Sequence, residues 1–333
     1  MTTREFEIAR SVLVGDTADV YLHRTLNILR SEGVNPEVAM EFTAGRDSVF
    51  CGMAEVKTLL QRVLPEAGRE VYALDEAAQV SKGEVALRIR APYASFGLYE
   101  TAICGTLASC SGWATGAREC VDAAGEVPVV CFGARHVHPS VAGLLDYAAV
   151  VGGKCAAGSS TLGGRLSGHT PSGTMSHSLV MLMGDTVRAM LAFDRHMPPE
   201  VPRVALVDTF RDEAEEAIEV AKATKDKLRG VRLETPDERG GVTPELVKEV
   251  RARLDQAGHS QVDIYVSGDL TPDRIRQFVA AKAPVAGFAV GRYIACSDPV
   301  LFSADIKEIG GKHVARRGRI PGITQNSRLA RVM

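Results

Sequence analysis

An arginine and two histidines stand directly after a short apolar run of the sequence. The run covers residues 127–132, and Arg135, His136 and His138 follow it, with Pro139 behind them. Arginine offers a planar set of donors to a carboxylate or phosphate, and imidazole nitrogens add further hydrogen bonds. This group predicts an anion site at the end of a strand. A solvated turn whose basic residues pair with nearby acids is the alternative, and these residues alone do not separate the two.

Polar residues or glycines follow four further apolar runs. They are Asp208 and Thr209 after VALV, Glu234 after VRL, Ser267, Gly268 and Asp269 after DIYV, and Gly291 and Arg292 after GFAV. Residues at the carboxyl ends of barrel strands meet on one rim, so we expect these to lie together. Three acids there, Asp208, Glu234 and Asp269, could hold a hard divalent cation, although helix caps and ion pairs explain any single acid more simply.

Residues 152–178 form a glycine-rich segment that resembles a loop wrapped around a ligand, because glycine leaves main-chain amides unobstructed. A flexible linker is the alternative. The abrupt change to an apolar helix at Leu179 argues against it. Ser176 and His177 stand at the start of that helix, where main-chain amides favour anions.

Strand-like and helical runs alternate from residue 127 onward. The strands are expected at 127–132, 203–207, 230–233, 263–266 and 286–290, and the helices at 140–150, 178–193, 211–225, 243–257 and 272–281. This alternation predicts parallel βα units that form a barrel with its site at the βα loops. An open doubly wound sheet is the alternative. No GxGxxG follows a strand and GxxxxGK[ST] is absent, which disfavours dinucleotide and P-loop sites.

The first part of the chain has a different pattern. Short strands are expected at 38–42, 49–51, 70–74 and 85–90, with helices at 24–31 and 54–64. Residues 98–120 are rich in small side chains, which is typical of a closely packed helix. We expect an N-terminal domain over residues 1–110 and a second domain over 111–296, with 297–333 as a possible addition to the first.

Composition limits the classes of function. The chain has 333 residues, 24% of them charged, and a net charge of −2. No bulk positive charge attracts nucleic acid or an anionic membrane. No signal peptide or membrane-spanning run is apparent, so we expect a cytoplasmic protein that binds small molecules. The seven cysteines have no metal-like spacing and are expected in the core.

Several segments resemble motifs of the shorter, archaeal-like nicotinate phosphoribosyltransferases, and they occur in that family's order. FGARHVHP (132–139) resembles the FGARRxHP-type motif, SGTMSHS (172–178) the GTxxHS segment, VDTF (207–210) and RLETPDERGG (232–241) the VDT and RLDTP-type motifs, and SGD (267–269) and GFAVGRYIA (287–295) the SGG and FGVGTxIA segments. DVY (19–21) is similar to an early DxY, and SGWATGAREC (111–120) to the SGIATxT segment of the related quinolinate enzymes. The resemblance runs from Asp16 to Gly322.

The resemblance implies a type II phosphoribosyltransferase, with an N-terminal α/β sandwich-like domain and an irregular α/β barrel of parallel βα units. Such enzymes join nicotinate to phosphoribosyl pyrophosphate (PRPP) in NAD salvage, giving nicotinate mononucleotide and pyrophosphate. Magnesium neutralises the pyrophosphate, and ATP hydrolysis often assists. The sites are completed across a dimer or higher homo-oligomer.

The resemblance also implies roles for particular residues. Arg135 would hold the pyridine carboxylate, and Tyr21 of a neighbouring subunit would stack on the ring. Asp208 and Glu234 would organise the ribose hydroxyls and magnesium, and His177 matches the histidine that ATP-coupled members phosphorylate. Gly268 and Gly291 would cradle the 5-phosphate, and the remaining expected substrate contacts are His136, Thr174, Ser267 and Arg292.

The chain departs from the family motifs around the expected phosphate site. Glu234 replaces an Asp, Asp269 and Ala289 replace glycines, and Arg292 stands in place of a Thr. An added carboxylate disfavours a phosphate, whereas an added arginine compensates or binds a different anion. Together with Trp113, these departures leave open a phosphoribosyl transfer to another aromatic carboxylate. A non-catalytic relative that binds a ligand is the third interpretation.

Overall fold

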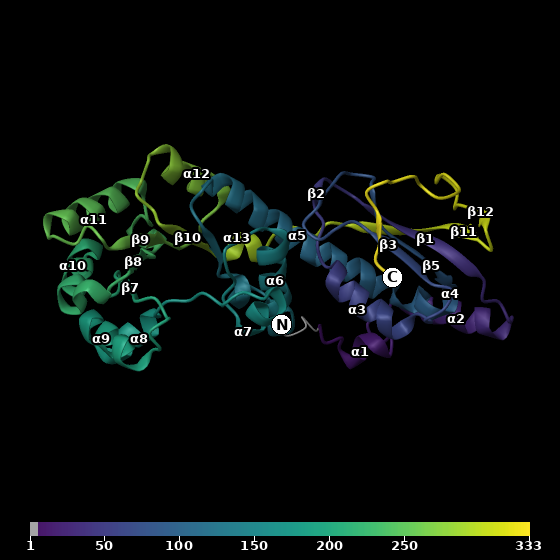
Figure 1. Ribbon diagram of the computed structural model, residues 1–333, viewed down its shortest axis with the longest axis horizontal. Coiled ribbons are helices and arrows are strands. Elements are labelled where there is room, and N and C mark those ends of the chain that lie inside the picture. Colours follow the sequence, from purple (N-terminus) through teal and green to yellow (C-terminus); the bar gives the residue numbers. More distant parts are fainter. Residues whose placement is uncertain (1–5) are drawn as a thin grey trace.

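The computed structural model describes residues 6–333, and Figure 1 shows two sheets at opposite ends of the molecule with a long helix, α5, between them. The first sheet has six strands in the order β12-β11-β1-β5-β3-β13. Its pairs are antiparallel. The strands are β1 (Glu37–Ala44), β3 (Glu70–Ala73), β5 (Val85–Pro92), β11 (Phe302–Ile309), β12 (Lys312–His313) and β13 (Ala330–Arg331).

The end of the chain therefore returns to the first sheet, where β11 pairs with β1 and β13 pairs with β3. A second, two-stranded sheet pairs β2 (Ser48–Val49) with β4 (Gln79–Val80). The helices of this part are α1 (Arg10–Leu13), α2 (Val20–Ser31), α3 (Met53–Val63), α4 (Tyr93–Phe96) and the 3₁₀ turn η1 (Gly97–Tyr99).

Helix α3 packs on this sheet through one apolar face. Met53, Val56, Leu59 and Leu60 are its buried residues, at the spacing of a single helix face. They belong to one hydrophobic cluster with Phe42 of β1 and with side chains of β5. These elements lie where the alternating and helical patterns predicted them.

Helix α5 (Glu100–Ala124) joins the two parts and is packed closely on several sides. A side chain at Gly112 would place its Cβ 2.6 Å from the carbonyl oxygen of Asp298, and one at Gly153 would lie 2.3 Å from Ala117. Small residues therefore let neighbouring main chain approach this helix. Because α5 runs through residues 110 and 111, a division of the chain at that point stays a proposal.

The second sheet is parallel throughout, in the order β6-β10-β9-β8-β7. Its strands are β6 (Val129–Cys131), β7 (Val204–Leu206), β8 (Gly230–Leu233), β9 (Asp263–Val266) and β10 (Gly287–Val290). Ala157 forms a further parallel bridge to Val130, on the other side of β6 from β10. The expectation of an irregular α/β barrel of parallel units beside an N-terminal α/β domain is confirmed.

Helices and short turns connect these strands, as the alternation of the sequence predicted. They are η2 (Gly133–His136), α6 (Pro139–Tyr147), the π turn η3 (Ala148–Gly152), α7 (Thr161–Ser167), α8 (His177–Met183), α9 (Thr186–His196), α10 (Glu213–Thr224), η4 (Lys225–Lys227), η5 (Asp237–Arg239), α11 (Pro244–Gln256), α12 (Pro272–Ala280) and α13 (Arg292–Ala295).

Two sequence predictions in this part were wrong. The single helix expected at 178–193 is two helices, because Gly184 takes a left-handed φ of +76° and the Asp185 carboxylate accepts a hydrogen bond from the Arg188 N–H. The glycine-rich segment 152–178 is not one loop, since it contains α7 and the strand-like residue Ala157.

Within residues 6–333, no helix combines the length and apolar character that a bilayer crossing requires. The cysteines are free thiols, and all except Cys104 and Cys296 are buried, in agreement with the expected core role.

Candidate active site

The carboxyl ends of the parallel strands lie next to one another along one rim of the second sheet. The predicted residues follow these strands in spatial order: Arg135 and His136 after β6, Gly291 and Arg292 after β10, Ser267 to Asp269 after β9, Glu234 after β8, and Asp208 after β7. The strand order of the sheet therefore places the candidate residues at the ends of neighbouring strands, as a barrel requires.

Asp208 is the most deeply enclosed acid of this rim, with 1% of its side chain exposed. Its Oδ2 accepts a hydrogen bond from the main-chain N–H of Glu234 at 2.5 Å. Its Oδ1 is buried and has no hydrogen-bond partner among the described residues. Burial raises the pKa of Asp208 to about 6, against the lowering effects of that hydrogen bond and of His177.

His177 reaches this rim from the first turn of α8. The Ser176 hydroxyl oxygen accepts a hydrogen bond from the Leu179 N–H, so the helix begins where the sequence predicted. The imidazole Nδ1 lies 3.1 Å from the Thr209 hydroxyl, and Nε2 lies 3.5 Å from Asp208 Oδ1. With 40% of its side chain exposed, His177 is hydrogen-bonded to Thr209, faces Asp208 and is still open to a reactant.

Glu234 pairs with Arg232, a residue that the sequence reasoning missed. The two charged groups are 3.0 Å apart, and the guanidinium lies 5.6 Å from the centre of the Phe132 ring. Burial lowers the pKa of Arg232, while Glu234 and Asp208 favour its charged form. The available signal was an arginine inside the strand run GVRL, since a buried cation requires nearby acids.

The glycines after β9 and β10 lie close to other rim residues. Gly268 has a left-handed φ of +92°, and a Cβ built on it would lie 3.6 Å from Glu234 Cγ. A Cβ on Gly291 would lie 3.1 Å from both His136 Nε2 and the Phe132 carbonyl oxygen, so these neighbours leave little room for a side chain. Asp269 and Arg292, both departures from the family motifs, form an ion pair with 3.4 Å between Oδ1 and Nε.

The remaining barrel residues of the predicted set differ in their surroundings. Arg135 and His136 are exposed, and the Arg135 side chain makes no ion pair with any residue of 6–333. Ser267 is buried, with its hydroxyl 3.3 Å from the Leu233 carbonyl oxygen that accepts from it. Thr174 is half-buried in the segment before α8 and donates to the Met175 carbonyl oxygen. The hydroxyls of Ser267 and Thr174 are therefore used within the fold.

Tyr21 is not brought to this rim within one chain. It lies on α2, at the end of the molecule opposite β7 and β8 in Figure 1, and its side chain is 57% exposed. It lines a hollow of about 840 Å³ with Glu100, Asp305 and Arg316. Burial and the neighbouring acids Glu100 and Asp19 raise the pKa of Tyr21.

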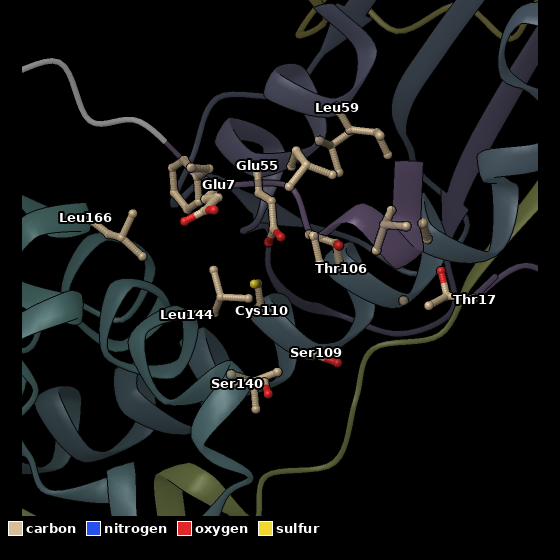
Figure 2. A pocket seen from close by; sticks show the side chains of 18 of the residues that line it. Glu7, Thr17, Glu55, Leu59, Thr106, Ser109, Cys110, Ser140, Leu144 and Leu166 are labelled. Atoms are coloured by element: carbon tan, nitrogen blue, oxygen red, sulfur yellow. The ribbon is translucent and has the colours of Figure 1, made fainter. Parts of the chain in front are cut away.

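A separate cavity of about 1130 Å³ lies between α3, α5, α6 and α7, lined mainly by apolar side chains. Figure 2 shows the Glu55 carboxylate directed into it, near Cys110 and Thr106. Glu55 Oε2 has no hydrogen-bond partner among the described residues, and burial raises the pKa of Glu55 to about 7. None of the strand-end residues named above lines this cavity, so it is distinct from the rim.

Among residues 6–333, no three or more His, Cys, Asp or Glu side chains are grouped as metal ligands. Asp208 and Glu234 are thus a pair of carboxylates on adjacent strands, and Asp269 is paired with Arg292 instead of joining them. The suggestion of a three-acid cation site is therefore wrong for the described residues.

Models of known protein families show which family the chain belongs to. The family model described as "Quinolinate phosphoribosyl transferase, N-terminal domain" matches residues 19–111, and the one described as its C-terminal domain matches residues 113–305. The chain belongs to the quinolinate phosphoribosyl transferase family. The matched C-terminal domain contains every barrel residue of the rim, from Arg135 to Arg292.

Two curated proteins are similar to about two thirds of this chain. A nicotinate phosphoribosyltransferase of Mycobacterium tuberculosis is 35% identical over 224 residues, which are 67% of this chain and 47% of that protein. One of Bacillus subtilis is 28% identical over 222 residues, 66% of this chain and 44% of that protein. The chain thus matches about half the length of these curated relatives.

Two solved structures are similar to almost the whole chain. The crystal structure of nicotinate-nucleotide pyrophosphorylase from Pyrococcus furiosus has a TM-score of 0.87 and 39% identity, and covers 97% of this chain and 82% of its own. Human nicotinic acid phosphoribosyltransferase has a TM-score of 0.71 at 18% identity, with 92% and 77% covered, and shows the shared fold.

Proposed function

We propose that the chain transfers the phosphoribosyl group of PRPP to nicotinate, giving nicotinate mononucleotide and pyrophosphate for NAD biosynthesis. One observation carries the proposal: an unpaired arginine, two carboxylates and two glycines follow neighbouring parallel strands. They are Arg135, Asp208, Glu234, Gly268 and Gly291. An acceptor anion, a ribose and a phosphate each find complementary groups on one rim.

The carboxylates would act on the sugar. Glycosyl transfer of this kind develops positive charge at the ribose, and fixed negative groups in a water-poor site stabilise it. Asp208 is held by the Glu234 main chain and Glu234 by Arg232, so neither needs to reorganise during the reaction. Arg135 would hold the pyridine carboxylate and thereby direct the ring nitrogen at the reacting carbon.

Magnesium fits this pair of acids when the substrate supplies further ligands. Mg²⁺ is commonly bound through one or two carboxylates together with substrate phosphates and water. Asp208 and Glu234 would hold it, because Asp208 Oδ1 has no hydrogen-bond partner among the described residues. When bound, the ion would neutralise charge on the departing pyrophosphate.

The distribution of charge favours nicotinate as the acceptor. Arg232 is paired with Glu234 and Arg292 with Asp269, whereas the exposed Arg135 makes no ion pair with any residue of 6–333. The guanidinium of Arg135 can therefore bind a carboxylate without giving up another partner. The relatives of M. tuberculosis and B. subtilis are also named for nicotinate. Quinolinate, with two carboxylates, is the second candidate, because the matching family models are described by it.

His177 is the proposed site of ATP coupling. Its imidazole lies between Thr209 and Asp208 and is partly exposed, so a ring nitrogen could attack the γ-phosphorus of ATP, with ADP as the leaving group. Asp208 would stabilise the cationic ring after transfer. In the His177→Ala variant, ATP should no longer stimulate nucleotide formation, whereas the ATP-independent rate remains measurable. Equal stimulation of both proteins would remove His177 from this role.

Completion of the site requires a second copy of the chain in this proposal. Tyr21 is half exposed and lies far from the rim of its own chain, so it would stack on the acceptor ring bound to a neighbouring subunit. His136 and Arg292 would add contacts to the nucleotide phosphate. Thr174 and Ser267 would support the wall of the site through their hydrogen bonds within the fold.

The test is a transfer assay with purified protein, PRPP, magnesium and either nicotinate or quinolinate, with and without ATP. We expect release of pyrophosphate and a product with the mass of nicotinate mononucleotide from nicotinate. Turnover of quinolinate alone, with loss of carbon dioxide, would support the second candidate. Absence of product from either acid would favour a ligand-binding relative.

A further inference from the structure

The ion pair between Asp269 and Arg292 occupies the part of the rim where the proposed function places a phosphate. Asp269 follows Gly268 at the end of β9, and Arg292 follows Gly291 at the end of β10. The carboxylate Oδ1 and guanidinium Nε are 3.4 Å apart. The pair therefore joins the two neighbouring strand ends that hold the cradle glycines.

Both partners of this pair are open to solvent, with 65% of the Arg292 side chain and 46% of the Asp269 side chain exposed. An exposed ion pair contributes little to stability because water competes for both groups. The guanidinium can therefore leave the carboxylate when a stronger anion arrives. A phosphate monoester carries more charge than a carboxylate and offers more acceptor oxygens.

We propose that Asp269 competes with bound phosphate for Arg292 and thereby sets the phosphate affinity of this end of the site. Without a ligand, Asp269 keeps Arg292 at the ends of β9 and β10 and reduces the local positive charge. A bound phosphate gains the full positive charge of the guanidinium only when the carboxylate moves away from it. This inference rests on the proposed function. It makes Asp269 a residue that determines specificity among phosphate-containing ligands.

The competition would act most strongly on ligands that have a phosphate and nothing else. Inorganic phosphate contacts only the residues at the ends of β9 and β10. A small loss of affinity there is therefore enough to keep most of the sites free of inorganic phosphate. PRPP and the nucleotide product bind through the ribose and further groups as well, and they tolerate the same loss. The same loss of phosphate affinity would also speed the release of the nucleotide product.

The backbone allows a sharp test of Asp269. Its φ of +37° lies in the left-handed region, which asparagine adopts with ease. Asp269→Asn therefore removes the charge while keeping the shape and the turn. Asp255→Asn is the matched control, because Asp255 pairs with Arg251 at 2.7 Å, is 49% exposed and lies near the end of α11, at the far end of the strands.

The measurement is binding of inorganic phosphate to the intact protein by calorimetry, together with its inhibition of PRPP use. We expect Asp269→Asn to bind phosphate about 3- to 10-fold more tightly, Arg292→Gln to bind it more weakly by a similar factor, and Asp255→Asn to match the wild type. In the Arg292→Gln background, the gain from Asp269→Asn should disappear, because the two side chains act through each other.

Unchanged or weaker phosphate binding in Asp269→Asn would overturn the inference. It would also be overturned if Asp269→Asn increased phosphate affinity by the same factor in the wild type and in Arg292→Gln. The calorimetric result does not depend on turnover. Failure of the transfer assay with tighter phosphate binding in Asp269→Asn would overturn the proposed function alone. Normal transfer with unaltered phosphate affinity would overturn the competition alone.

Discussion

The carboxylate of Asp208 accepts a hydrogen bond from the main-chain N–H of Glu234, with 2.5 Å between Oδ2 and N. This contact joins the ends of β7 and β8, which are neighbours in the parallel sheet. It fixes the buried carboxylate so that Oδ1 lies on the side of His177. One hydrogen bond therefore joins the two acids proposed for the ribose, and the other carboxylate oxygen of Asp208 faces the histidine proposed for ATP.

The Asp208→Asn variant should gain stability and lose activity. The folded-state pKa of about 6 lies above the ordinary value of 3.8, so the folded protein binds this proton more tightly than the unfolded chain does. The stabilising contribution of the proton is therefore lost as pH rises from about 4 to above 6. Asparagine cannot ionise, so the variant should be more stable by about 1–3 kcal/mol at pH 8 and close to wild type at pH 4.

Denaturant unfolding at both pH values measures this effect, and Asp255→Asn, at an exposed position, should show no such gain. Wild-type transfer should also decline as pH falls through about 6, because the carboxylate becomes neutral. A variant that is less stable at pH 8 than the wild type would contradict the assignment of a costly buried charge to Asp208.

Loss of the Arg135 guanidinium should weaken acceptor binding without disturbing the fold, because the side chain is exposed. A hydrogen bond between charged groups contributes about 1.5–3 kcal/mol, so Arg135→Ala should raise the KM for nicotinate about 10- to 100-fold. The KM for PRPP should change little. Arg229→Ala is the control, since Arg229 is 65% exposed and lies before β8, at the opposite end of the strand. An unaltered KM for nicotinate would remove Arg135 from the carboxylate role.

If each site is shared between two subunits, two inactive variants should restore activity when they are mixed in one dimer. Tyr21→Ala and Arg135→Ala should each be poorly active alone, because every site lacks one contact. After unfolding and refolding together in equal amounts, half the dimers are mixed, and each has one site that carries both changes and one intact site. About one quarter of wild-type activity should then return. A mixture no more active than the separate variants would show that Tyr21 does not complete a neighbour's site.

Glu55→Gln should stabilise the protein at high pH. Burial raises the folded-state pKa of Glu55 to about 7 from 4.5, so the charged form is disfavoured in the folded protein. Stability from this group is present below about pH 4.5 and is lost as pH rises through 7. The variant should gain about 1–3 kcal/mol at pH 8, reduced by any water in the cavity, and gain nothing at pH 4.5. Glu66→Gln, at an exposed position, is the control. Equal stability of Glu55→Gln and wild type at pH 8 would show that water already solvates the carboxylate.

Much of the rim could be predicted because each of its residues follows an apolar run. Asp208, Glu234 and Arg292 stand one or two positions after β7, β8 and β10, and the alternation of strands with helices indicates parallel units. The helix start at His177 was visible for a similar reason, since a serine precedes an apolar run and caps it.

Other features depend on long-range packing that local patterns do not contain. Ala157 pairs with β6 although its neighbours are small residues with low strand preference. The sequence predicts Arg232 only as part of a strand, whereas its role depends on its burial and on its contacts with Glu234 and Phe132. The pairing of Asp269 with Arg292 requires β9 and β10 to be neighbours, and the order of strands in a sheet is not visible in the sequence.

A crystal structure of the protein with nicotinate mononucleotide is the most direct test that one rim binds both the acid and the sugar phosphate. The account predicts the ring carboxylate on the Arg135 guanidinium, the ribose beside Asp208 and Glu234, and the phosphate between Gly268 and Gly291. A nucleotide bound away from these strand ends, for example in the cavity that Glu55 lines, would contradict it.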